Sequence, residues 1–193
     1  MITDVKITGN QILSDNKYTL KKITYSYTRA DGSHTTQARE VYDRGDGAVI
    51  LLYNAHQKTV ILTRQFRLPT YVNGNTTGML IEACAGLLDN DTPEACVRRE
   101  SMEETGYKIT DIQKVYEIYM SPGAVTEKLY FFIAAYTPAM KQQSGGGAEG
   151  EEENIDVLEV PFGEALRMLA HGQIQDAKTI ILLQYLQINN IIS

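Results

Sequence analysis

The residues of this chain that most clearly suggest chemistry are clustered glutamates at helical spacing. Glu100, Glu103 and Glu104 fall within about 100° of one another around a helix axis, since each residue advances a helix by about 100°. Like charges at this spacing repel one another and destabilise a helix. A divalent cation would offset the repulsion, and hard cations such as Mg²⁺ prefer oxygen ligands shared between protein and phosphate.

From the residues alone, two interpretations of this acidic segment stay open. A solvated helix face can carry such charges without binding anything. A cation site is favoured because Arg99 lies four residues before Glu103 and can pair with it, which would leave Glu100 and Glu104 to share one ion. The apolar residues of the segment also do not line up along one face of the helix, which indicates a helix that is enclosed within a binding site.

The elements that would position these glutamates are strands and helices spread along the chain. Thr92, Pro93 and Glu94 predict a helix start, and Gly106 predicts its end in a left-handed cap. Residues 30–33 predict a hairpin turn. We expect strands over residues 18–29, 34–42, 48–53, 59–65, 112–119, 129–136 and 155–160, helices over 162–170 and 177–188, the latter capped by Asp176, and loops over 71–78 and 138–154. This order predicts an α/β (α+β) fold with a mixed β-sheet sandwiched between helices and a small N-terminal antiparallel β-sheet.

The composition is that of a globular protein and excludes several function classes. The chain has 193 residues, 43% of them hydrophobic, and a net charge of −6 at pH 7. A chain with this net negative charge lacks the excess of basic residues that binds nucleic acid or an anionic membrane, so neither is expected as a partner. Residues 1–10 lack a signal-peptide core, and with only Cys84 and Cys96 available we expect a cytoplasmic protein without a disulfide framework.

At the acidic segment the chain resembles the Nudix hydrolases, whose signature is G-x5-E-x7-R-E-U-x-E-E-x-G-U, with U a bulky aliphatic residue. The matching residues are Gly86, Arg99, Glu100, Glu103, Glu104 and Gly106. The chain departs from the signature where Thr92 replaces the first glutamate and where Ser101 and Tyr107 replace aliphatic residues. The stretch from Gly86 to Arg99 is also one residue shorter than in the signature.

Over nearly its whole length the chain is similar to one branch of that family, the GDP-mannose pyrophosphatases, which are close to the ADP-ribose pyrophosphatases. The similar segments are residues 40–45, 64–67, 120–123 and 145–149. The resemblance implies Mg²⁺ held by the backbone carbonyl of Ala85, by Glu100 and Glu104, and by a glutamate of a late acidic loop. Counting from the following strand identifies that glutamate as Glu153, and counting from the glycines identifies it as Glu151. We prefer Glu153, because a strand fixes register better than a glycine loop.

The same resemblance implies roles for further residues. Glu153 or Glu151 would accept the proton of the attacking water, with Glu103 and Glu104 also in the catalytic set. Arg67 would bind the diphosphate, for which its planar guanidinium is suited. The implied substrate contacts are Lys17, Arg39, Glu40, Arg67, Ala85, Gly86, Leu87, Glu104, Glu127 and Lys178.

The activity implied by the resemblance is Mg²⁺-dependent hydrolysis of a nucleoside diphosphate sugar, GDP-mannose, to GMP and mannose 1-phosphate. ADP-ribose hydrolysis and a non-catalytic nucleotide-sugar sensor are the alternatives. Residues 1–44 are expected to exchange with a second subunit, and residues 45–193 to form the hydrolase domain. This arrangement predicts a homodimer with a shared active site.

Overall fold

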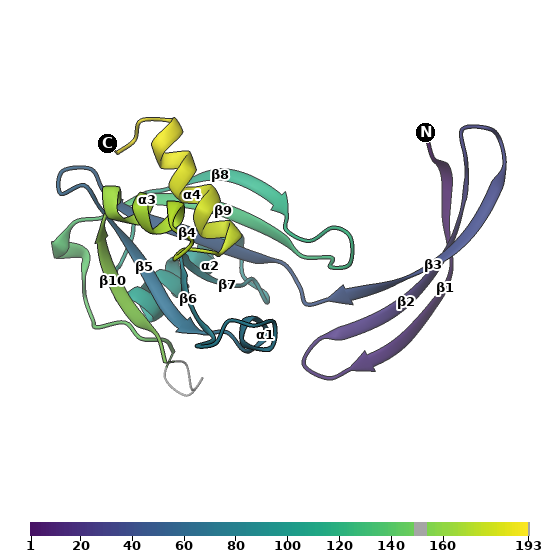
Figure 1. The fold of residues 1–193 in the computed structure, drawn as a ribbon, viewed down its shortest axis with the longest axis horizontal. Helices are drawn as coiled ribbons and strands as arrows, with labels where there is room; N and C mark the ends of the chain where they lie inside the picture. Colours follow the sequence, from purple (N-terminus) through teal and green to yellow (C-terminus); the bar gives the residue numbers. More distant parts are fainter. Residues whose placement is uncertain (149–153, 193) are drawn as a thin grey trace. The chain divides into compact units, whose positions relative to one another are not determined.

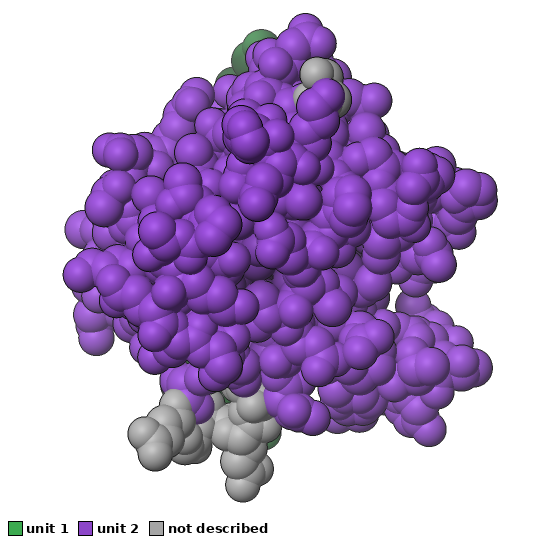
Figure 2. Space-filling view, turned by 90° about the vertical axis from the view of Figure 1, so that its left-hand side faces the viewer, with its two compact units in different colours: residues 1–46, 118–129 green, residues 47–117, 130–193 purple. Residues whose placement is uncertain are grey.

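The computed structural model describes residues 1–148 and 154–192 (Figure 1). The chain divides into two compact units, one of residues 1–46 with 118–129 and one of residues 47–117 with 130–193 (Figure 2). Within the described residues, every helix is too short or too polar to cross a bilayer.

The first unit contains a three-stranded antiparallel sheet. Its strands β1 (Thr3–Asp15), β2 (Thr19–Thr28) and β3 (His34–Asp43) follow one another in the order of the chain. The predicted hairpin between β2 and β3 is confirmed, and in its turn the Asp31 carboxylate accepts the Ser33 N–H at 2.9 Å. The sequence analysis assigned no strand to residues 3–15, because Val5, Ile7, Ile12 and Leu13 do not alternate regularly with polar residues there.

The larger sheet runs in the order β10 (Asp156–Pro161), β5 (Thr59–Phe66), β4 (Gly47–Asn54), β9 (Lys128–Ala135) and β8 (Ile112–Tyr119). Two short strands extend it, with β6 (Met79–Glu82) paired to β5 and β7 (Cys84–Leu87) paired to β4. The sequence missed both, since strands of four residues are too short to show alternation. Short helices α1 (Leu68–Val72) and η2 (Pro138–Met140) also lie in segments that we expected to be loops or left unassigned.

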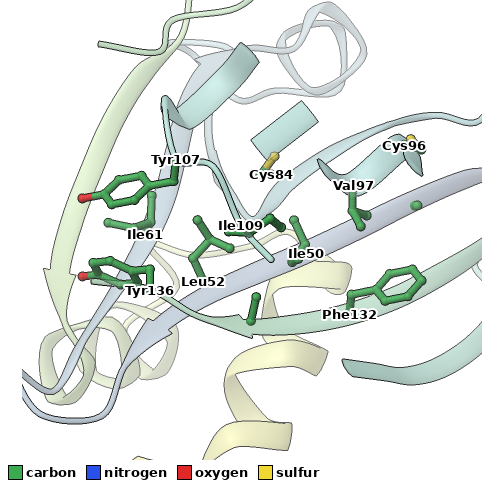
Figure 3. Close-up of a cluster of buried hydrophobic side chains, with 12 residues drawn as sticks. Ile50, Leu52, Ile61, Cys84, Cys96, Val97, Tyr107, Ile109, Phe132 and Tyr136 are labelled. Carbon is green, nitrogen blue, oxygen red and sulfur yellow. The ribbon is translucent and has the colours of Figure 1, made fainter. Parts of the chain in front are cut away.

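Helices cover the larger sheet on both faces. Ala48, Ile50 and Leu52 of β4 join a buried cluster with Cys96 and Val97 of α2 (Pro93–Glu100). Figure 3 shows Ile50 and Leu52 in this cluster. The intervening residues of β4 point to the opposite face and are also buried. On that side of the core α4 (Ala177–Ile188) contacts β4 and contributes three buried leucines outside the cluster, while α3 (Phe162–Ala170) packs on β5 and β10. The expected α/β architecture is confirmed.

The acidic helix begins and ends where its sequence predicts. Thr92 caps it, with its hydroxyl accepting the Ala95 N–H at 3.2 Å, and Pro93 occupies the first turn. The helix continues as one π-helical turn, η1 (Ser101–Thr105), and ends at Gly106, whose φ of 79° is left-handed. Irregular π turns inside helices are often found at functional sites, and this one carries Glu103 and Glu104.

Candidate active site

Gly86 lets the Glu100 carboxylate lie directly against strand β7. A Cβ atom on Gly86 would be only 1.8 Å from Oε1 of Glu100, so any larger residue would displace the carboxylate. The Glu100 side chain is 13% exposed. The glycine of the signature therefore provides the space into which an acidic side chain of the facing helix fits.

Glu104 lies against the same strand. Its side chain is buried, and Oε2 accepts the Ala85 N–H at 3.3 Å. Burial, together with the negative charge of Glu104, raises the pKa of the neighbouring Cys84 thiol well above its usual value. The structure thus brings Ala85, Gly86, Glu100 and Glu104 together, as the sequence predicted.

Arg99 pairs with more carboxylates than we expected. It bonds Glu103 at 3.0 Å, which confirms the predicted pair, but it also bonds Glu100 at 2.8 Å and Asp91 at 3.1 Å. The pairing therefore extends beyond the predicted partner, because the guanidinium fork reaches several carboxylates at once, Glu100 among them. Burial opposes the charge of Arg99, but these carboxylates outweigh it and raise the arginine pKa.

The glycine-rich segment after η2 binds the C-terminal end of the acidic helix. Gly146 donates its N–H to the Glu104 carbonyl at 2.9 Å, and Gly147 donates to the Glu103 carbonyl at 3.1 Å. Gly145 has a φ of 76°, and a Cβ there would lie 2.4 Å from the Glu104 carbonyl oxygen. These bonds satisfy carbonyls that the end of a helix leaves without partners. Glu151 and Glu153, the two candidates for the catalytic base, lie outside the described residues.

A second cluster of charges forms around Glu82 at the end of β6. Glu82 is 3% exposed and binds two cations, with Oε2 accepting from Nε of Arg67 at 2.7 Å and Oε1 accepting from Nζ of Lys178. Lys178 also bonds Asp176 at 2.8 Å, and Asp176 caps α4 by accepting the Thr179 N–H at 2.9 Å. Burial alone would lower the pKa of Lys178, but Glu82 and Asp176 outweigh it, so that the pKa is raised.

A surface hollow of about 780 Å³ adjoins this cluster, since Asp176 belongs to both. The hollow lies between the α1 region and the start of α4. Most of the side chains that line it carry hydroxyl, amide or carboxylate groups, which suit a ligand rich in hydrogen-bonding groups. They are Thr70, Asn73, Asn75, Thr76, Gln175 and Asp176.

Comparison with known families accounts for this arrangement. Residues 43–182 match the model of the NUDIX domain, and residues 4–42 match that of the GDP-mannose pyrophosphatase NudK N-terminal domain. The chain belongs to the Nudix hydrolases.

Curated relatives of this Nudix hydrolase match it over its full length. A GDP-mannose pyrophosphatase of Klebsiella pneumoniae is 55% identical over 100% of this chain and 96% of the relative. Another, of Enterobacter sp. strain 638, is 55% identical over 100% of both chains, and one of Escherichia coli O1:K1 is 54% identical over 99% of both. Among solved structures, that of an ADP compounds hydrolase shares the fold, with a TM-score of 0.71, 16% identity and coverage of 96% of this chain and 95% of that one.

The other expected substrate contacts belong to the first unit of this Nudix hydrolase. Glu127 is nearly buried there and pairs with Arg44 at 3.3 Å. Arg39 and Glu40 lie exposed on β3, and Lys17 lies in the turn between β1 and β2. Arg67, Ala85, Gly86, Leu87, Glu104 and Lys178 belong to the second unit.

The donor set around β7 fits a divalent metal of the kind that Nudix hydrolases use. Residues 1–148 and 154–192 assemble no cluster of three or more acidic, histidine or cysteine side chains able to hold a metal. They do bring two carboxylates, Glu100 and Glu104, to the strand that carries the Ala85 carbonyl. Carboxylate and carbonyl oxygens are the ligands of hard cations, and Mg²⁺ commonly completes its shell with water and substrate phosphate.

Glu82 is the part of this arrangement that sequence reasoning missed. It ends the apolar run Met79-Leu80-Ile81, where a single carboxylate could have signalled a buried charge that needs partners. Its partners, however, lie 15 and 96 residues away along the chain. Such pairings follow from the fold and not from local spacing.

Proposed function

We propose that this Nudix hydrolase cleaves the pyrophosphate bond of GDP-mannose in a Mg²⁺-dependent reaction, giving GMP and mannose 1-phosphate. The observation that carries the proposal is the full-length similarity, at 54–55% identity, to relatives that bear the name GDP-mannose pyrophosphatase. The carboxylates packed against Ala85 and Gly86 support it, since they give the oxygen donors that this chemistry requires.

In this proposal Glu100, Glu104 and the Ala85 carbonyl hold the metal. Bound Mg²⁺ neutralises the diphosphate and makes a coordinated water more acidic. Arg67 and Lys178 bind the phosphate that is not attacked, because both are cations next to the same buried carboxylate. Glu153, or else Glu151, accepts the proton of the attacking water. Glu103 holds Arg99, and through it the orientation of Glu100.

The proposal is tested by product release from a panel of GDP-mannose, GDP-glucose and ADP-ribose, with Mg²⁺ and after treatment with a chelator. We expect GMP and mannose 1-phosphate to form only when the metal is present. Turnover of Glu104→Gln should fall by about 100-fold or more, with the fold unchanged by circular dichroism. Preferential cleavage of ADP-ribose would instead assign the alternative activity, and binding without turnover would assign a sensor.

We further propose that residues 1–44 mediate a homodimer whose partner completes the active site, with residues 45–193 as the hydrolase domain. Strand β1 supports this, because large apolar side chains project from it into solvent. Val5 is 60% exposed and Ile7 is 71% exposed, and a face of this kind is usually covered by another chain. Two free, buried cysteines also fit the reducing cytoplasm that we propose as its location.

A further inference from the structure

The geometry points to Glu82 as a positioning residue that holds Arg67 and Lys178 side by side as one diphosphate-binding unit. This inference deepens the proposed function and rests on it. Glu82 touches neither substrate nor metal in this account. It acts through the two cations that it binds.

The contacts of Glu82 are divided between its two oxygens. Oε2 accepts from Nε of Arg67 at 2.7 Å, and Oε1 accepts from Nζ of Lys178. One carboxylate group therefore separates the two cations, and it fixes a residue that follows β5 relative to a residue on the first turn of α4. Two cations held by one carboxylate can bind neighbouring phosphoryl oxygens of a diphosphate through charge-assisted hydrogen bonds.

The pairing through Nε leaves the outer part of the arginine available. Among residues 1–148 and 154–192, the two Nη groups of Arg67 have no protein acceptor, and the side chain is 39% exposed. Lys178 is more enclosed, at 14% exposure, and Asp176 holds it from a second side. Glu82 thus restrains Arg67 at Nε, which leaves the Nη groups available to bind phosphate oxygens.

Burial explains why this carboxylate keeps both partners. Glu82 is 3% exposed, and a carboxylate buried to this degree is stable only when it is paired. The two cations therefore cannot move away from it without leaving a charge uncompensated. They stay in place before substrate arrives, and preorganisation of this kind reduces the ordering cost of binding.

The test compares the wild type with Glu82→Gln, which keeps the shape of the side chain and removes its charge. We expect KM for GDP-mannose to rise by about tenfold, with a smaller change in kcat, because positioning of the phosphate and not the chemical step is affected. Calorimetry with inorganic pyrophosphate and Mg²⁺ should show a matching loss of affinity. Glu164→Gln is the control, since Glu164 pairs with Arg167 on an exposed face of α3 and should leave both quantities unchanged.

A double-mutant cycle separates positioning from a merely structural role. If Glu82 acts through Arg67 and Lys178, then adding Glu82→Gln to Arg67→Ala should raise KM only by the part that acts through Lys178, short of the product of the two single effects. Fully multiplicative effects would overturn the inference, as would an unchanged KM and pyrophosphate affinity in a folded Glu82→Gln protein. Should Glu82→Gln fail to fold, Glu82→Asp replaces it, because the shorter side chain cannot reach both cations and should shift KM in the same direction. A wild type that binds pyrophosphate but leaves GDP-mannose intact would refute the proposed function and not this inference.

Discussion

Gly86 and Glu100 constrain each other at the level of single atoms, because the carboxylate occupies the space that a side chain on Gly86 would fill. The conflicting atoms are Oε1, Cδ and Cγ of Glu100, at 1.8, 2.2 and 2.7 Å from the position of a Cβ, and all three belong to one flexible side chain. The side chain can therefore swing away at low cost to the fold. What would be lost is a metal ligand in its proposed position.

We accordingly predict that Gly86→Ala lowers kcat with GDP-mannose by about tenfold or more while the melting temperature changes little. The measurement is steady-state turnover at saturating Mg²⁺, with thermal unfolding of the same samples. Gly163→Ala is the matched control, because a Cβ at that helical position meets nothing within 4 Å. Full activity in Gly86→Ala would show that Glu100 does not need its position against β7.

The environment of the two cysteines predicts that both thiols are unreactive in the native protein. Burial, reinforced by nearby Glu100, raises the pKa of Cys96 to about 12, and burial also raises that of Cys84. At about pH 8 only about 10⁻⁴ of Cys96 is thiolate, the form that reacts. We expect a thiol reagent to label neither cysteine in the native protein and both after unfolding in denaturant. Fast stoichiometric labelling of the native protein would contradict the burial described here.

At the scale of elements, local signals predicted the acidic helix but not its surroundings. Helix caps depend only on the residues next to them in the chain. Thr92, Pro93 and Gly106 therefore predicted the ends of the helix without any knowledge of the fold. The contacts of Arg99 with Asp91 and Glu100 depend on how the preceding loop folds back, which no spacing rule describes. The pairing of Glu82 with Arg67 and Lys178 joins three distant segments, and no local pattern predicted it.

The glycine-rich segment packs closely against the C-terminal end of the acidic helix, and this contact should contribute to stability. Gly145 has a left-handed φ, and a Cβ there would lie 2.4–2.9 Å from backbone atoms of Glu104 and Thr105. Gly172 has a similar φ of 72° but nothing within 4 Å of its Cβ position. Alanine at either site suffers the backbone strain, of about 1 kcal/mol, and only at Gly145 does it also collide with the helix end.

We predict that Gly145→Ala reduces the free energy of unfolding by about 1–3 kcal/mol more than Gly172→Ala does. Urea denaturation followed by circular dichroism provides the comparison. Activity of Gly145→Ala should fall as well, because the same segment leads into the acidic residues proposed to include the catalytic base. Equal losses of stability in the two variants would show that the contact between this segment and the helix end contributes nothing.

In the whole molecule, strand β1 of the first unit exposes large apolar side chains that another chain could cover. A strand whose large apolar side chains face water is a site for association, and β1 exposes several of them at 41–71%. The sequence resemblance predicted a dimer through this region. The local pattern of apolar residues could not, since β1 itself escaped prediction.

The final prediction is that the full chain forms a homodimer through β1 and needs it for activity. Light scattering on the eluting protein should give twice the chain mass of 21.6 kDa. Ile7→Lys places a charge where an apolar side chain is 71% exposed, so it should shift the protein towards monomer and lower turnover by about tenfold or more. Ile188→Lys is the matched control, because Ile188 is 75% exposed at the end of α4 and should leave mass and activity unchanged. A monomeric wild type with full activity would contradict the shared site, since each chain would then carry every residue that the reaction requires.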